Sequence, residues 1–162
     1  MEQLIVLGTK AATGSNLQPW AFLHIQDKEK LDAMSEQIKK ELFENIDQYS
    51  HLKQYQKWLT NPEFHVFNRA QEALVIYGDT RSFYYREDCS LAAANIMLAA
   101  HDMGIGTCWL GFAEFHMNTP EFKAEYNIPE YYAHVCTMSM GYSCTELSPP
   151  KRVRPIIFGK QI

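Results

Sequence analysis

The chain has 162 residues, of which 46% are hydrophobic and 21% are charged, and its formal net charge is −4. This length predicts one domain over residues 1–162, which buries about 70% of the surface of its unfolded chain and needs neither a disulfide nor a metal for stability. The charge balance argues against nucleic acid as a partner, and the most apolar stretch, residues 91–100, is too short to cross a bilayer, so we expect a soluble protein without membrane partners.

The first expected element is a helix, because apolar residues recur at helical spacing from Leu4 to Ala12. Gly14 is the natural residue to end this helix in a left-handed conformation. Pro19 prevents the helix from resuming, and the alternation after it predicts a strand over residues 20–25.

Two amide side chains, Asn16 and Gln18, lie on this predicted helix-to-strand connection. Each amide offers both a donor and an acceptor, which is the pattern needed to pair with the edge of a heterocycle such as a flavin pyrimidine. The alternative is an Asx-type turn in which Asn16 caps its own backbone. Composition alone favours the turn and leaves both interpretations open.

Asp27 is predicted to cap a helix with one apolar face, formed by Leu31, Met34, Ile38 and Leu42. Residues 44–68 are rich in Gln, Lys and Tyr and lack clean periodicity, which indicates a helical excursion or a lid. Its aromatic residues, Tyr49, Tyr55 and Trp58, could cover a ligand, although packing on a neighbouring element is the favoured interpretation.

The near-continuous apolar run 73–79 predicts a central strand, followed by a long helix that Asp88 or Ser90 caps and Gly104 ends. Residues 105–112 read as a short buried strand with glycines at both ends. A bare glycine allows backbone N–H groups to approach a flat ligand closely, and Gly111 is the candidate for such a contact. A short helix over 120–126, a strand over 133–142 and an extended tail from Pro149 complete the prediction.

Four blocks of this sequence resemble the FMN-dependent nitroreductase family in their order and spacing. They are Asn16-Leu17-Gln18-Pro19-Trp20, Val75-Ile76 with Asp79, Asp88-Cys89-Ser90-Leu91-Ala92-Ala93, and Gly104-Ile105-Gly106-Thr107-Cys108-Trp109-Leu110-Gly111. The resemblance covers nearly the whole chain, up to Arg154. It implies an α+β sandwich, with an antiparallel-rich central sheet flanked by helices. It also implies an intertwined homodimer with FMN at the interface, each site drawing residues from both subunits.

The resemblance also implies a set of cofactor-binding residues, namely Thr13, Gly14, Asn16, Gln18, Leu110, Gly111, Arg152 and Arg154. Asn16 resembles the amide that bonds the pyrimidine edge, and Gly111 resembles the position whose backbone N–H approaches flavin N5, with Leu110 near the ring. Arg152 and Arg154 resemble the basic residues that hold the FMN phosphate, a role that suits the bidentate guanidinium group.

The implied function is NAD(P)H-dependent oxidoreduction, in which NAD(P)H reduces FMN and is replaced by a nitro-aromatic, quinone or related acceptor. The cofactor performs this chemistry, so no catalytic residue is assigned to the chain. Members of the family carry an Arg-Arg-Ser type segment before the first matching block, and this sequence lacks it. We therefore expect weaker FMN affinity unless another chain supplies donors. The alternative is a flavin-binding or cofactor-poor relative with a binding or regulatory role.

A metal-dependent or thiol enzyme is the third class of function, and the sequence argues against it. The six histidines show no His-x-x-x-His spacing, and the four cysteines show no Cys-x-x-Cys spacing. Cys108, on an expected buried strand, is interpreted as inert packing. The absence of a leader and of a disulfide pattern favours a reducing cytoplasm.

Overall fold

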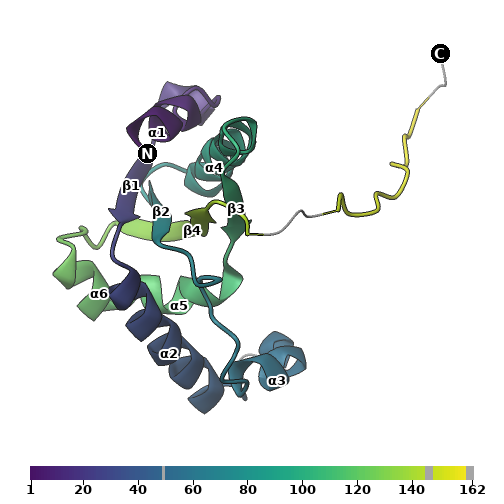
Figure 1. Ribbon diagram of the computed structural model, residues 1–162. Coiled ribbons are helices and arrows are strands. Elements are labelled where there is room, and N and C mark those ends of the chain that lie inside the picture. Colours follow the sequence, from purple (N-terminus) through teal and green to yellow (C-terminus); the bar gives the residue numbers. More distant parts are fainter. Residues whose placement is uncertain (49, 145–147, 160–162) are drawn as a thin grey trace.

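The computed structural model describes residues 1–48, 50–144 and 148–159. Its centre is a sheet of four strands in the spatial order β1-β2-β4-β3, and every neighbouring pair in this sheet is antiparallel (Figure 1). The strands are β1 (Trp20–Ile25), β2 (Glu72–Asp79), β3 (Gly106–Trp109) and β4 (Tyr132–Gly141).

Helices cover both faces of the sheet, which gives three layers. They are α1 (Glu2–Gly8), α2 (Lys28–Glu44), α3 (Gln56–Leu59), α4 (Tyr85–Asp102), α5 (Glu114–Met117) and α6 (Pro120–Glu125), with short 3-10 turns between some of them. One buried cluster joins the sheet to α1 and α4, and a second joins it to α2, α5 and α6. The expected α+β sandwich with an antiparallel sheet is therefore confirmed.

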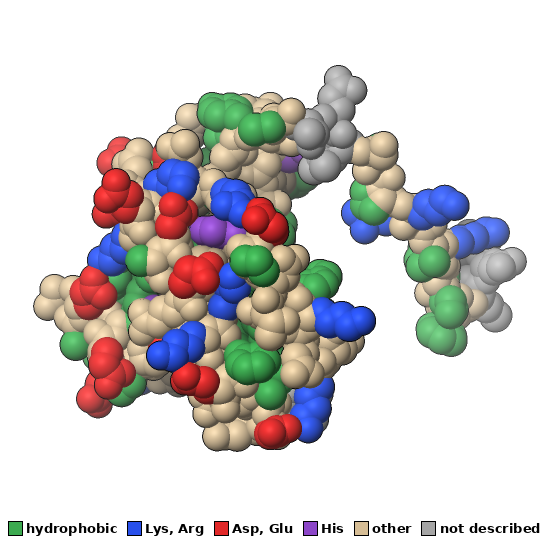
Figure 2. All heavy atoms as spheres, turned by 60° about the horizontal axis from the view of Figure 1, so that its bottom comes forward, with side chains coloured by type: hydrophobic (Ala, Val, Ile, Leu, Met, Phe, Trp, Pro, Cys, Tyr) green, Lys and Arg blue, Asp and Glu red, His purple; other side chains and the backbone are tan. Residues whose placement is uncertain are grey.

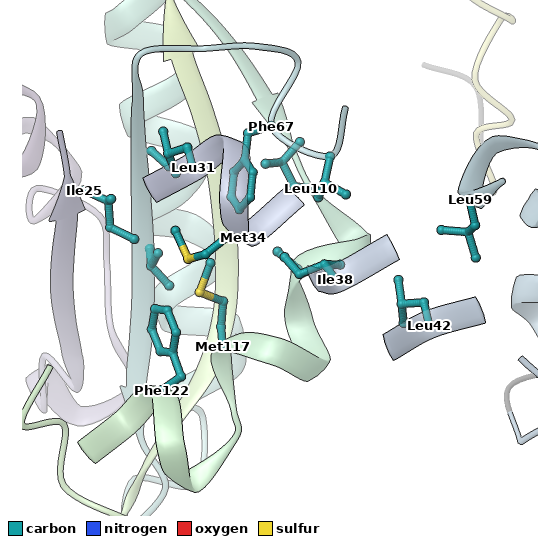
Figure 3. Packing of buried hydrophobic residues seen from close by; sticks show 14 of the residues in the cluster. Ile25, Leu31, Met34, Ile38, Leu42, Leu59, Phe67, Leu110, Met117 and Phe122 are labelled. Atoms are coloured by element: carbon teal, nitrogen blue, oxygen red, sulfur yellow. The ribbon is translucent and has the colours of Figure 1, made fainter. Parts of the chain in front are cut away.

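Helix α2 forms where the sequence predicts it. The Asp27 side chain accepts a hydrogen bond from the backbone N–H of Lys30, which satisfies one of the free donors at the helix start. The apolar face, which includes Leu31, Met34 and Ile38, is buried against the sheet (Figure 3).

The two central strands, β2 and β4, hold the core of the molecule. Leu74 and Ile76 of β2 face the α1 and α4 layer, whereas Val75 and Tyr77 face the α2 layer. Because side chains alternate between the faces of a strand, a strand covered on both faces reads as a continuous apolar run. The prediction of a central strand over residues 73–79 is confirmed.

Two expected helix boundaries are wrong. The first helix ends at Gly8, and Gly14 does not adopt a left-handed conformation; Ser15, Asn16 and Gln18 do so instead. Helix α4 begins at Tyr85, so Asp88 and Ser90 lie inside it and cap nothing. Asp88 bonds elsewhere, as described below, and the Ser90 hydroxyl donates to the carbonyl of Arg86.

The segment 44–68 forms a 3-10 helix (Ser50–Tyr55), followed by α3. The ring of Tyr55 meets Phe112 edge-on at 5.4 Å between centroids, so this segment packs on the turn after β3. Trp58 is 53% exposed. Tyr49 lies outside the described residues. Packing on a neighbouring element, the favoured interpretation, accounts for Tyr55.

Residues 148–159 form neither helix nor strand, and they lead away from the body of the molecule (Figure 1). Acidic and basic side chains alternate over the face of the body in Figure 2, which presents no basic field there. In the part of the chain that the structure describes, no helix is long and apolar enough to span a membrane.

Candidate functional site

The turn between α1 and β1, residues Thr13–Gln18, has an unusual backbone. Ser15, Asn16 and Gln18 have φ values of 50°, 56° and 49°, a left-handed region that residues other than glycine rarely adopt. The Thr13 hydroxyl accepts a hydrogen bond from the backbone N–H of Gln18 at 3.3 Å. The Thr13 hydroxyl therefore closes this turn, and no hydrogen bond from the Asn16 side chain to its own backbone, the alternative interpretation, occurs among the described residues.

The two amide side chains bond to each other, because Gln18 Nε2 donates to Asn16 Oδ1 at 3.1 Å. Both residues are exposed. Asn16 Nδ2 and Gln18 Oε1 have no hydrogen-bond partner among the described residues, so this exposed pair keeps one unused donor group and one unused acceptor. This pair fits the edge of a flavin pyrimidine, which offers both acceptor oxygens and an N–H donor.

Residues from the end of β2 and the first turns of α4 fix the turn at its start and just after its end. The backbone N–H of Gly14 donates to Asp88 Oδ1 at 2.9 Å, and the N–H of Asp79 donates to the carbonyl of Pro19 at 2.8 Å. The ring of Tyr84 lies directly against Gly14. The turn is thus fixed to the body of the protein although its amides are exposed.

Gly111 lies immediately after β3, at the other edge of the sheet. The Leu110 N–H donates to the carbonyl of Thr137 at 2.8 Å, which anchors the backbone just before Gly111. The Leu110 side chain is buried in the core beside Phe67 (Figure 3), so it is the backbone here that a ligand can reach. Gly111 is exposed, and a Cβ built on it would meet no atom within 4 Å.

The predicted site residues do not come together within one chain. The Thr13–Gln18 turn precedes β1 and Gly111 follows β3, and these two strands form opposite edges of the sheet with β2 and β4 between them. Arg152 and Arg154 are exposed in the tail that leads away from the body. The predicted site residues therefore lie at two separate places on the body of the protein and in the tail.

Arg81, in the segment between β2 and α4, is already engaged. Its guanidinium bonds both carboxylate oxygens of Asp79, with Nη2 to Oδ2 at 2.6 Å, and it stacks 4.0 Å from the centroid of Tyr131. The hydrogen bonds from Arg81 lower the pKa of the Asp79 carboxyl, so this pair stays ionised. Arg81 is thus committed to a local ion pair rather than available for a phosphate.

The cysteines that the structure describes differ in their burial. Burial raises the pKa of the Cys89 thiol to about 12 and also raises that of Cys136, so both stay protonated. Cys108 is exposed, contrary to the expected buried strand, because β3 is an edge strand whose side chains are only partly covered. No group of three or more potential metal ligands occurs among the described residues.

A separate cleft of about 420 Å³ lies on the α2 side of the sheet, between α2 and α6. His116 is almost fully buried at its edge, and its Nδ1 lies 3.2 Å from Glu41 Oε2. None of the predicted cofactor-binding residues lines this cleft.

Sequence reasoning missed Asp88 and Tyr84 as residues of this site. Asp88 belongs to one of the blocks quoted above, but its spacing suggested a helix cap. Tyr84 carried no signal, because its contact with Gly14 joins residues 70 positions apart that only the fold brings together.

A comparison of the sequence with known families agrees with the fold. The model of the nitroreductase family matches residues 1–142, and the chain therefore belongs to the nitroreductase family. A protein of Archaeoglobus fulgidus with the provisional name NADH dehydrogenase/NAD(P)H nitroreductase is 28% identical over 147 residues, which cover 88% of this chain and 71% of that protein. An iodotyrosine deiodinase of Thermotoga neapolitana is 27% identical and covers 78% of this chain and 72% of its own length.

A solved structure supports the same fold. The nitroreductase of Bacteroides fragilis, crystallised with bound FMN, superimposes with a TM-score of 0.78 at 22% identity and covers 94% of this chain and 81% of its own. The deiodinase shows that members of this family differ in substrate. The chain thus has the fold of a nitroreductase that was crystallised with bound FMN.

Proposed function

We propose that this chain binds FMN and acts as an NAD(P)H-dependent oxidoreductase that reduces nitro-aromatic, quinone or similar acceptors. The observation that carries the proposal is the exposed donor and acceptor pair of Asn16 and Gln18 on a turn fixed by long-range contacts. Rigid donors and acceptors of this kind orient a flat heterocycle without the cost of ordering themselves on binding. The names of the relatives support the same cofactor and electron donor.

The site is proposed to be complete only in a homodimer, in which the Thr13–Gln18 turn of one copy meets Gly111 of the other. Several large apolar side chains stand exposed in a single copy. They include Val6 of α1, Leu91 and Leu98 of α4, Trp109 of β3, and Ile156, Ile157 and Phe158 of the tail. Contiguous exposed apolar surface marks an interaction site. A second copy would cover it and bring the two halves of the site together.

In this arrangement the chain binds and orients the cofactor. Asn16 and Gln18 would pair with the pyrimidine edge, the backbone N–H of Gly111 would lie near N5, and Arg152 and Arg154 would hold the phosphate. Bound FMN would supply the hydride-transfer chemistry between NAD(P)H and the acceptor.

Titration of the purified protein with FMN, followed by NADH or NADPH oxidation in the presence of a nitro-aromatic or a quinone, tests the proposal. Asn16→Ala is expected to weaken FMN binding by about tenfold, because it removes one hydrogen bond to the ring. Gln26→Ala, an exposed amide at the opposite end of β1, is the matched control and leaves the affinity unchanged. Arg154→Ala weakens binding because it removes a phosphate partner.

The outcomes separate the two candidate functions. FMN binding with turnover supports the oxidoreductase. FMN binding without turnover by either nucleotide identifies the alternative, a flavin-binding protein with a binding or regulatory role. A protein that remains colourless and binds no FMN would overturn both.

A further inference from the structure

The Thr13–Gln18 turn holds a conformation that its own residues disfavour. Ser15, Asn16 and Gln18 all occupy the left-handed region, where the Cβ of an L residue crowds the backbone. The hydrogen bonds inside the turn reach no further than five residues, from Gln18 N–H to the Thr13 hydroxyl. Contacts from outside the turn are therefore needed to keep it in this one conformation.

The contact from outside at the start of the turn comes from Asp88. Its carboxylate Oδ1 accepts the Gly14 N–H at 2.9 Å, across 74 residues of sequence. Asp88 is only 3% exposed, and Oδ2 is buried without a hydrogen-bond partner in the part of the chain that the structure describes. Burial of a carboxylate is costly, and the bond to Gly14 offsets part of that cost.

A neighbouring carboxylate provides the comparison. Glu87, on the same first turn of α4, is exposed, and no ion pair or hydrogen bond of its side chain occurs within the described ranges. Both residues place a negative charge at the helix start, where the helix dipole favours it. Of the two, only Asp88 bonds to the turn, so the favourable interaction with the helix dipole does not account for this contact.

We infer that Asp88 is a positioning residue of the cofactor site, which acts through Gly14 and holds the Thr13–Gln18 turn so that the amides of Asn16 and Gln18 stand ready for the flavin. This inference rests on the proposed function, because that proposal identifies FMN as the ligand of the turn. Asp88 itself is buried and does not touch the cofactor. Its effect on FMN is therefore indirect, and the conformation of the turn without cofactor is the direct readout.

The test compares Asp88→Ala, Asp88→Asn and the control Glu87→Ala in the full chain. Amide hydrogen exchange of the peptide covering residues 9–20 is measured without FMN, and FMN affinity is measured by titration. Asp88→Ala is expected to speed exchange in the turn by at least about tenfold and to weaken FMN binding by a similar factor. Asp88→Asn keeps an oxygen that can accept the Gly14 N–H, and it is expected to stay within about threefold of the parent.

Glu87→Ala changes neither quantity, because its side chain does not contact the turn. If Asp88→Ala does not fold, Asp88→Ser, whose hydroxyl is too short to reach Gly14, carries the same expectation. Unchanged exchange in Asp88→Ala overturns the inference, and so does an Asp88→Asn variant as impaired as Asp88→Ala. If the parent binds no FMN, the proposed function fails, while the exchange measurement still decides whether Asp88 holds the turn.

Discussion

The ring of Tyr84 occupies the space in which a side chain on residue 14 would stand. A Cβ built on Gly14 would meet Cδ2 of Tyr84 at 2.7 Å, closer than real Cβ atoms approach other atoms. Gly14 is therefore required for lack of room and not for a left-handed backbone. Gly14→Ala is expected to lower the free energy of unfolding by about 1–3 kcal/mol, the usual cost of overpacking, as measured by urea denaturation.

Two further variants make this prediction specific to the contact. Gly111→Ala adds the same methyl group where no atom lies within 4 Å, so its stability should match that of the parent. The double variant Gly14→Ala with Tyr84→Ala removes the opposing ring and should recover part of the loss. A Gly14→Ala protein as stable as the parent would show that Tyr84, which is half exposed, simply moves aside.

Elements with strong local signals were predictable from the sequence. Helix α2 has its cap at Asp27 and a regular apolar face, and β2 is a continuous apolar run, so local pattern and tertiary burial agree. The strand β3 was predicted to be buried, but it lies at the edge of the sheet and Cys108 is exposed. The prediction failed because a short apolar strand has the same sequence pattern at the edge and at the centre of a sheet.

The candidate site residues came from side-chain chemistry, from a glycine beside a strand and from the family resemblance. Asn16 and Gly111 were named on both kinds of ground, and the structure adds that their segments lie at opposite edges of the sheet. The role of Asp88 could not be read from the chain, because the bond to Gly14 spans 74 residues and depends on the packing of α4. Long-range contacts of this kind leave no periodic signal in a sequence.

A buried hydrogen bond ties β2 to the short helix α5. The Tyr77 hydroxyl donates to the carbonyl of Met117 at 2.7 Å, and Tyr77 is 1% exposed. Burial raises its pKa far above the ordinary value, so the hydroxyl remains a donor at any working pH. Tyr77→Phe leaves the carbonyl unpaired and should cost about 1–3 kcal/mol in urea unfolding. Tyr142→Phe, at a residue 78% exposed, is the control, and an equal effect in both variants would contradict this role for Tyr77.

His134 makes the stability of the protein depend on pH. It is buried, its Nε2 lies 2.8 Å from the Thr137 hydroxyl, and its Nδ1 has no hydrogen-bond partner within the described residues. Burial, with a smaller contribution from the charge of Arg86, lowers the pKa of His134 to about 4. The unfolded chain takes up this proton near pH 6.5, whereas the folded protein takes it up only near pH 4. The free energy of unfolding therefore falls as the pH drops from about 6.5 towards 4, and His134 does not change it above pH 6.5.

The expected loss between pH 7.5 and pH 4.5 is on the order of 2–3 kcal/mol, and urea unfolding across this range measures it. His134→Gln should flatten the profile, whereas His101→Gln, at an exposed histidine of α4, should keep the parent slope. Burial also lowers the pKa of His65, so some slope of the same sign remains in the His134 variant. Parallel profiles for the parent and His134→Gln would rule out this origin.

The last prediction concerns α4, whose two faces differ sharply. Ala93, Ile96 and Ala100 are fully buried against the sheet, whereas Leu91 and Leu98, seven residues apart and thus on one stripe, are 49% and 72% exposed. If a second copy covers this stripe, Leu98→Glu places two charges in the interface and removes two buried leucines. At about 1.5 kcal/mol or more for each side chain, the dimer should dissociate at least about a hundredfold more readily.

Light scattering over a range of protein concentrations measures this change, and FMN titration follows its consequence. Because each site is proposed to need both copies, Leu98→Glu should lose FMN affinity at concentrations where it is monomeric, although Leu98 belongs to neither half of the site. Phe43→Glu is the matched control, since Phe43 is an exposed apolar residue of α2 at 42% exposure, on the other side of the sheet. A parent that is monomeric at every concentration, or a Leu98→Glu protein that dimerises as the parent does, would show that this stripe of α4 is not where two copies meet.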